Sequence, residues 1–227
     1  MRLVLVHSSG LGPRQWSRLL RLWGGEAEVP ALTGYAGVPM SDAPHWHDDL
    51  AVLRATVRPG DLVFGHSYGG FLALQLAMEL PLAGLLVHEP VAVGVLGPTE
   101  IGDEDFFALP PGGPSAWISR LVDWWNGPGA WDALPAAARA PFERHAAKVH
   151  AEVVTIGRDR TPAEAYAAIG CPLVVCSGST SRDEAQTMCD EVARGAGAER
   201  RVLEGLGHMA PVTHPGAFVD ILRGLGA

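Results

Sequence analysis

Residues 61–70 read Asp-Leu-Val-Phe-Gly-His-Ser-Tyr-Gly-Gly, an apolar run that passes through Gly65, Ser67 and Gly69 into a helical pattern. This order predicts a strand, a sharp turn and a helix, with Ser67 at the apex of the turn. We expect glycine on both sides of the serine because the backbone segments approach too closely for a Cβ atom. The turn would hold the Ser67 hydroxyl clear of the sheet and aim the N-terminus of the following helix at a developing anion.

Short apolar runs alternate with helical patterns along most of the chain, which favours a doubly wound α/β fold. The runs are too continuous to be half exposed and are typical of buried parallel strands. The expected strands are Leu3–Val6, Leu62–Phe64, Leu85–Val87, Leu173–Cys176 and Arg201–Leu203, with a further one near Glu28–Ala31. The expected helices are Arg14–Trp23, Trp46–Val57, Tyr68–Leu80, Asp183–Ala193 and Pro215–Leu225. We therefore expect a mostly parallel sheet of about six strands, with its ligand site at their carboxyl ends.

Residues 93–168 interrupt this alternation, because they contain no convincing strand but many prolines and glycines. Structureless connections longer than ~15 residues are uncommon, so this segment is predicted to be an inserted helical cap. The core is then expected to comprise residues 1–92 and 169–227. Aromatic residues of the cap are expected to line an apolar substrate pocket, namely Phe106, Trp117, Trp124 and Trp125. We expect at most two of the four tryptophans of this segment, which include Trp131, to face substrate, with the others forming the cap's own core.

Charge and cysteine usage narrow the possible partners. The net charge is −8, and Lys148 is the only lysine among 17 basic residues that form no polybasic run. Nucleic acid and anionic membrane surfaces are therefore not expected as partners. The three cysteines show no metal-ligand spacing, no signal peptide is visible, and no apolar stretch approaches the ~20 residues that span a bilayer. We expect a cytoplasmic protein that acts on a small molecule.

A serine at such a turn needs a base, and the base needs an orienting acid. His208, in Gly-Leu-Gly-His-Met, is the candidate base because it follows the last expected strand after a short glycine-containing loop. An oxyanion also needs two converging backbone N–H groups. The residue after the serine, Tyr68, is expected to supply one, and the loop His7–Gly10 after the first strand the other. Within that loop we favour Ser9 over Ser8.

Taken together, these motifs resemble those of the α/β-hydrolase superfamily, and the resemblance spans nearly the whole chain. The residues that carry it are His7-Ser8-Ser9-Gly10, Gly65-His66-Ser67-Tyr68-Gly69-Gly70, Glu89-Pro90 and Gly207-His208-Met209. The resemblance implies a triad of serine, acid and histidine, a cap over the site, and hydrolysis of an ester or related acyl compound. The chain departs from the family pattern in two ways: the usual His-Gly is His7-Ser8 here, and the leading hairpin is expected to be missing.

The acid of the implied triad is open between two residues. Members of the superfamily usually resemble one another in placing an aspartate three residues after a glycine in the loop that follows the penultimate strand. Here that glycine is Gly178 and the position is Ser181, which cannot hold an imidazolium by charge. Asp183 lies two residues further on, although it also fits the first turn of a helix. We favour Glu89, at the end of an expected strand where some members of this superfamily carry their acid, and keep Asp183 as the alternative.

The predicted function is that of a serine esterase for a small apolar or aromatic substrate. His208 would take the proton of Ser67 as its oxygen attacks a carbonyl, and water would release the acyl group from the enzyme. This mechanism needs no cofactor and no metal ion. Two alternatives use the same residues differently: cleavage of a lactone or a carbon–carbon bond by the same triad, and a non-catalytic binding protein, suggested by Ser181. The sequence does not predict the oligomeric state.

Overall fold

The core of the protein is one parallel β-sheet, seen in a computed structural model that describes residues 1–97 and 104–226. Its strands run in the order β2-β1-β3-β4-β5-β6 across the sheet. In chain order they are β1 (Leu3–Val6), β2 (Ala27–Glu28), β3 (Leu62–His66), β4 (Gly84–His88), β5 (Leu173–Gly178) and β6 (Glu199–Leu203). The predicted doubly wound parallel sheet is confirmed. The second strand ends at Glu28 instead of Ala31, because Pro30 has no N–H with which to continue the ladder.

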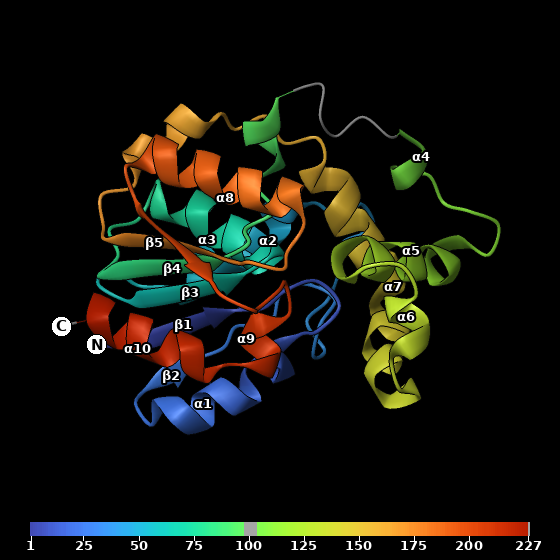
Figure 1. Cartoon of the computed structure of the whole chain (residues 1–227), viewed down its shortest axis with the longest axis horizontal. Coiled ribbons are helices and arrows are strands. Elements are labelled where there is room, and N and C mark those ends of the chain that lie inside the picture. Colours follow the sequence, from blue (N-terminus) through green and yellow to red (C-terminus); the bar gives the residue numbers. More distant parts are fainter. Residues whose placement is uncertain (98–103, 227) are drawn as a thin grey trace.

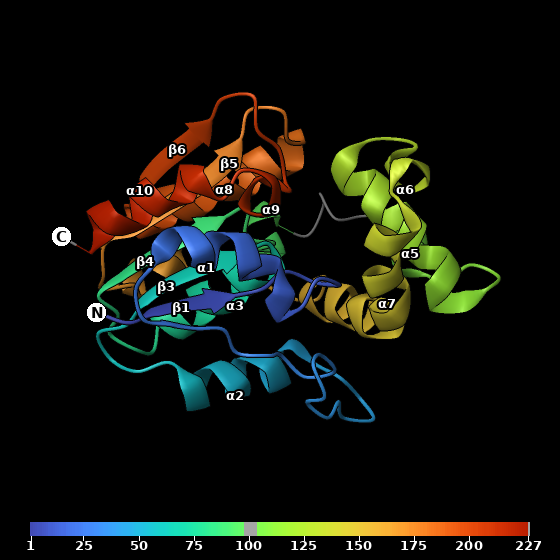
Figure 2. The same ribbon diagram turned by 90° about the horizontal axis from the view of Figure 1, so that it is seen from below.

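Helices cover both faces of the sheet (Figures 1 and 2). One face carries α2 (Trp46–Thr56), α3 (Tyr68–Ala77) and α8 (Asp183–Ala196), and the other carries α1 (Ser17–Trp23), α9 (Ala210–Thr213) and α10 (Gly216–Leu225). Side chains alternate between the two faces, so Val63 packs into the core on the α3 side and its neighbour Phe64 into the core on the α10 side. Because both faces are covered, β1, β3, β4 and β5 are buried throughout, which explains their continuous apolar sequences.

The register of the sheet brings the functional loops together. Val6 at the end of β1 pairs with Gly65 in β3, and His66 pairs with His88 at the end of β4. The loop after β1, the turn after β3 and the end of β4 therefore meet at one edge of the sheet. This is the edge at which ligands bind in open parallel sheets.

Four helices stand beyond this edge, away from both chain ends (Figures 1 and 2). They are α4 (Glu104–Phe107), α5 (Gly113–Asn126), α6 (Ala130–Ala133) and α7 (Ala136–Ile156). They share a small apolar core of their own, formed by Trp117, Ile118, Leu121, Ala146 and Val149. The flanking 3-10 helices Val93–Leu96 and Ala163–Ala168 instead pack on α8. Residues 98–103 of the expected cap lie outside the described residues.

None of the helices in the described parts of the chain has the length and apolarity that crossing a membrane requires.

Candidate active site

Ser67 occupies the turn between β3 and α3 in a backbone conformation that is unfavourable for a residue with a side chain. Its φ is 55° and its ψ −119°, a combination that costs roughly 1–3 kcal/mol and persists only where the surroundings impose it. A Cβ atom on Gly65 would lie 2.4 Å from the carbonyl oxygen of Gly69, and one on Gly69 would lie 2.4 Å from that of Val6. The expectation that close backbone approach requires glycine on both sides of the serine is therefore confirmed.

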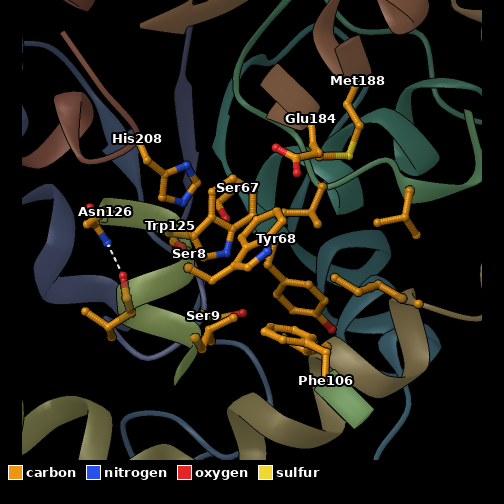
Figure 3. Close-up of a pocket in the computed structure, with 18 of the residues that line it drawn as sticks. Ser8, Ser9, Ser67, Tyr68, Phe106, Trp125, Asn126, Glu184, Met188 and His208 are labelled. Carbon is orange, nitrogen blue, oxygen red and sulfur yellow. Dashed lines mark hydrogen bonds between the residues drawn. The ribbon is translucent and has the colours of Figure 1, made fainter. Parts of the chain in front are cut away.

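His208 reaches this site from the loop between β6 and α9. Its Nδ1 atom lies 2.8 Å from Oε2 of Glu89. A carboxylate can only accept a hydrogen bond, so Nδ1 carries a proton, and in the neutral imidazole Nε2 then keeps its lone pair. The residue is buried and lines one cavity together with Ser67 (Figure 3). An imidazole held in this tautomer has the free nitrogen that a general base requires.

Glu89 stands at the end of β4, with a φ of 46° that turns its side chain toward His208. Its other carboxylate oxygen, Oε1, accepts the backbone N–H of Gly178 at 2.9 Å and the hydroxyl of Ser181. Burial by itself would raise the pKa of this carboxyl, but the hydrogen bond and charge of His208, with the Gly178 N–H, lower it to about 2. Glu89 is therefore ionised at neutral pH and able to hold an imidazolium by charge.

The two acids left open by the sequence lie in different surroundings. Asp183 is exposed in the first turn of α8, where the helix dipole stabilises a carboxylate. Ser181, at the position where an aspartate is usual, donates its hydroxyl to Glu89. The structure thus brings Glu89, and not Asp183, to His208.

A chain of hydrogen bonds connects the loop after β1 with the loop that carries His208. Oε1 of Gln15 accepts the N–H of Ser8 at 2.8 Å, and Nε2 of Gln15 lies 2.9 Å from Nδ1 of His66. Nε2 of His66 in turn lies 2.9 Å from the carbonyl oxygen of His208. Burial holds the pKa of His66 well below its usual range, so its ring is neutral. We assign the Gln15 amide as the donor to Nδ1, which leaves the Nε2 proton for the His208 carbonyl.

The candidate oxyanion donors, Ser9 and Tyr68, line the same cavity as Ser67 (Figure 3). Tyr68 begins α3, and the first N–H groups of a helix have no acceptor within the helix. The N–H of Ser8 is already bound to Gln15, which leaves Ser9 as the donor that the loop after β1 can offer.

Replacing Gln15 by methionine is expected to lower kcat about 10-fold and the free energy of unfolding by about 1–3 kcal/mol. Methionine matches the length of glutamine but leaves the Ser8 N–H and Nδ1 of His66 buried without partners. Urea unfolding and steady-state kinetics measure the two effects. The matched control is Gln75→Met on α3, which removes a hydrogen bond to Thr161, away from the site. If both variants lost turnover equally, the hydrogen bonds of Gln15 would have no specific effect on catalysis.

The cavity at Ser67 measures about 270 Å³, and most of its lining side chains are apolar. Phe106, Trp124 and Trp125 line it, but Trp117 does not. Trp117 is fully buried in the core shared by α5 and α7, where its Nε1 donates to the carbonyl oxygen of Phe106 at 2.6 Å. The expectation that Trp117 contacts substrate is corrected accordingly. Because Trp131 is also absent from the lining, two of the four tryptophans face the cavity, within the limit of two that was predicted.

Trp125 lines the cavity and also contacts the candidate base. Its ring stacks on the imidazole of His208, with centroids 4.0 Å apart and planes inclined by 17°. Trp125 and His208 also line a second cavity of about 370 Å³, which extends over Ser181 and Arg182. The stack covers one face of the imidazole, so the orientation of His208 depends on a side chain from α5. No periodicity or spacing in the sequence indicates such a contact.

Solved structures of several other proteins have the same fold as this chain. The structure of MenH from S. aureus superimposes with a TM-score of 0.75 at 15% sequence identity, over 99% of this chain and 92% of that one. A lipase-esterase related protein from Clostridium acetobutylicum also gives a TM-score of 0.75, at 13% identity over 99% and 93% of the two chains. The esterase RhEst1 from Rhodococcus sp. gives 0.69 at 20% identity, over 99% and 89%.

A match in sequence alone covers a shorter stretch. A pimeloyl-[acyl-carrier protein] methyl ester esterase from Aromatoleum aromaticum is 37% identical over 83 residues, which are 35% of this chain. The match spans 32% of that protein's own length. A model of the alpha/beta hydrolase family, in contrast, matches residues 3–221, and so includes the turn at Ser67, Glu89 and the loop at His208. This chain belongs to the alpha/beta hydrolase family.

Proposed function

We propose that the protein is a serine hydrolase that cleaves carboxylic esters of small apolar or aromatic substrates. Nε2 of His208 takes the proton from the Ser67 hydroxyl as its oxygen attacks the carbonyl carbon. The N–H groups of Ser9 and Tyr68 bind the oxyanion, and the alcohol leaves with the proton from His208. Water, activated by the same histidine, then releases the acid from Ser67. Glu89 keeps the imidazole in the required tautomer and stabilises its charged form.

One observation carries this proposal: Oε2 of Glu89 lies 2.8 Å from Nδ1 of His208, which lines the same cavity as Ser67. The backbone conformation of Ser67 supports it, because strain of this kind collects at functional sites. The apolar lining supports an apolar acyl or alcohol group. The esterase from Aromatoleum aromaticum supports an ester as the scissile group.

A fluorophosphonate probe tests the proposal. The Ser67 oxygen is expected to attack phosphorus, fluoride leaves, and the proton passes to His208. Intact-mass analysis should therefore show one adduct on the wild-type protein and none on Ser67→Ala. Absence of an adduct on the wild type, or equal labelling of both proteins, would contradict an activated Ser67.

A substrate panel tests the choice of bond. We expect hydrolysis of neutral p-nitrophenyl esters with apolar acyl groups, monitored by release of p-nitrophenolate. Esters, lactones and a β-diketone are compared at equal concentration on the wild type, with Ser67→Ala as the blank. Turnover of the lactones or the β-diketone without any turnover of the esters would replace the ester proposal by one of the two alternative reactions.

A further inference from the structure

The only lysine of the chain is buried where helix α7 packs against α2. Lys148 lies on α7 and is only 4% exposed. Its Nζ donates to Oδ2 of Asp49 at 2.6 Å and to Oγ1 of Thr33 at 3.0 Å, and lies 3.5 Å from Oε1 of Glu152. We call Asp49, Lys148 and Glu152 the buried ion cluster. Apolar side chains of similar volume often stabilise a fold as well as such a cluster does, so its presence calls for another reason.

One arm of the buried ion cluster ends at the first candidate oxyanion donor. The hydroxyl of Tyr68 donates to Oδ2 of Asp49 at 2.6 Å, the same oxygen that Lys148 binds. The backbone N–H of Tyr68 is the group expected to face the oxyanion. The position of that N–H is therefore tied, through its own side chain, to Asp49 and Lys148.

A second arm ends at the loop that supplies the other donor. The N–H of Gly10 donates to the hydroxyl of Tyr35 at 2.9 Å, and this hydroxyl donates to Oε2 of Glu152 at 3.2 Å. Gly10 directly follows Ser9, so the loop that contains the candidate donor is connected through Tyr35 to one side chain of α7.

Glu152 is only 1% exposed, so its carboxyl is removed from water. Burial raises the pKa of Glu152 to about 7, although the charge of Lys148 opposes the shift.

We propose that Lys148 and Glu152 are positioning residues, which hold the N–H groups of Tyr68 and Ser9 so that both converge on the oxyanion. This inference rests on the proposed serine hydrolase function. Neither residue lines the cavity, so neither touches substrate. Both residues lie on α7. The oxyanion donors would therefore be held in place only while α7 is packed against the core.

The test compares Glu152→Leu with Glu152→Gln. Leucine removes the acceptor for the Tyr35 hydroxyl, which in turn binds the N–H of Gly10. We expect kcat and the rate of fluorophosphonate labelling to fall about 10- to 100-fold, since one oxyanion donor is worth about 10²–10³-fold. KM is expected to change less than about 3-fold. Glutamine keeps an acceptor oxygen and is expected to restore both rates to within about 5-fold of the wild type. The matched control is Glu143→Leu, which removes an exposed carboxylate from the same helix. Urea unfolding and circular dichroism establish that each variant is folded.

A double variant, Asp49→Asn with Lys148→Met, removes the Asp49–Lys148 pair together, so that neither member of the pair is left buried without the other. We expect it to fold, to bind substrate with little change in KM, and to lose kcat by a similar factor. If the wild type reacts with the probe but folded Glu152→Leu and the double variant keep its kcat and labelling rate, the positioning role is overturned and the hydrolase proposal stands. If the wild type itself does not react, the hydrolase proposal fails, and this inference fails with it.

Discussion

Glu89→Gln is expected to lower kcat roughly 10³–10⁴-fold while the protein remains folded. A glutamine amide facing Nδ1 of His208 would donate a hydrogen bond, which favours the imidazole tautomer with its proton on Nε2. That tautomer cannot accept the proton of Ser67, and the imidazolium also loses its counter-charge. The amide oxygen can still accept the N–H of Gly178, so folding is preserved. Steady-state hydrolysis of the best ester from the panel measures the effect.

Asp183→Asn is the matched control for this experiment. Asp183 is exposed in α8, so its variant is expected to keep kcat within about 2-fold of the wild type. Urea unfolding should show both variants folded. Wild-type turnover in Glu89→Gln, or a large loss in Asp183→Asn instead, would remove Glu89 from the proposed triad.

Gly69→Ala is expected to destabilise the protein by at least about 3 kcal/mol and to abolish labelling of Ser67. The new methyl group would lie 2.4 Å from the carbonyl oxygen of Val6 and 2.5 Å from that of His7. Both are backbone atoms at the end of β1, which cannot move without breaking the central sheet. Relief of the clash must therefore displace the turn at Ser67, and with it the N–H of Tyr68. The free energy of unfolding in urea measures the loss.

Gly216→Ala gives the reference for this comparison. Gly216 begins α10, and among the described residues no atom outside its chain neighbours and its own helix backbone lies within 4 Å of the place where its Cβ would be. We expect unfolding free energy within about 1 kcal/mol of the wild type, because alanine is the better helix former. A Gly69→Ala protein as stable and as reactive as Gly216→Ala would mean that the turn has room for a side chain.

The sheet could be predicted from the sequence because four of its strands are buried on both faces. Runs such as Leu3–Val6 and Leu62–Phe64 need no periodicity to be recognised, only their length and apolarity. β2 was misplaced because two residues carry no pattern. The short helix α9 was not expected either, since four residues that include a proline have too little sequence for a helical period.

The site could be predicted only where chemistry and local pattern coincide. Ser67 and His208 each stand in a glycine-containing motif, which the family match includes. The contact of His208 with Glu89 joins residues 119 positions apart, so the sequence left Glu89 and Asp183 open. The packing of α5 on α7 buries Trp117 and places the ring of Trp125 on His208. The sequence carries no local pattern for that packing.

The buried ion cluster has one visible sign in the sequence. Lys148 is the only lysine among the 17 basic residues, and the other 16 are arginines. Glu152 follows Lys148 by four residues on the same helix. That spacing predicts a neighbouring pair on a helix surface. Burial of the pair against Asp49 arises from the packing of α7 on α2, which no local pattern encodes.

The positive φ angles of Ser67 and Glu89 mark the ends of two adjacent strands, β3 and β4, joined through α3. With Glu89 as the acid, nucleophile and acid belong to one contiguous strand–helix–strand module, and only the histidine is contributed from outside it. Transplanting residues 62–89 into a related scaffold would then transfer two thirds of the triad in a single exchange. The loop after β5 would have to come with it, because the N–H of Gly178 and the hydroxyl of Ser181 hold the Glu89 carboxylate, so an acid carried on β4 still depends on the neighbouring loop for its position.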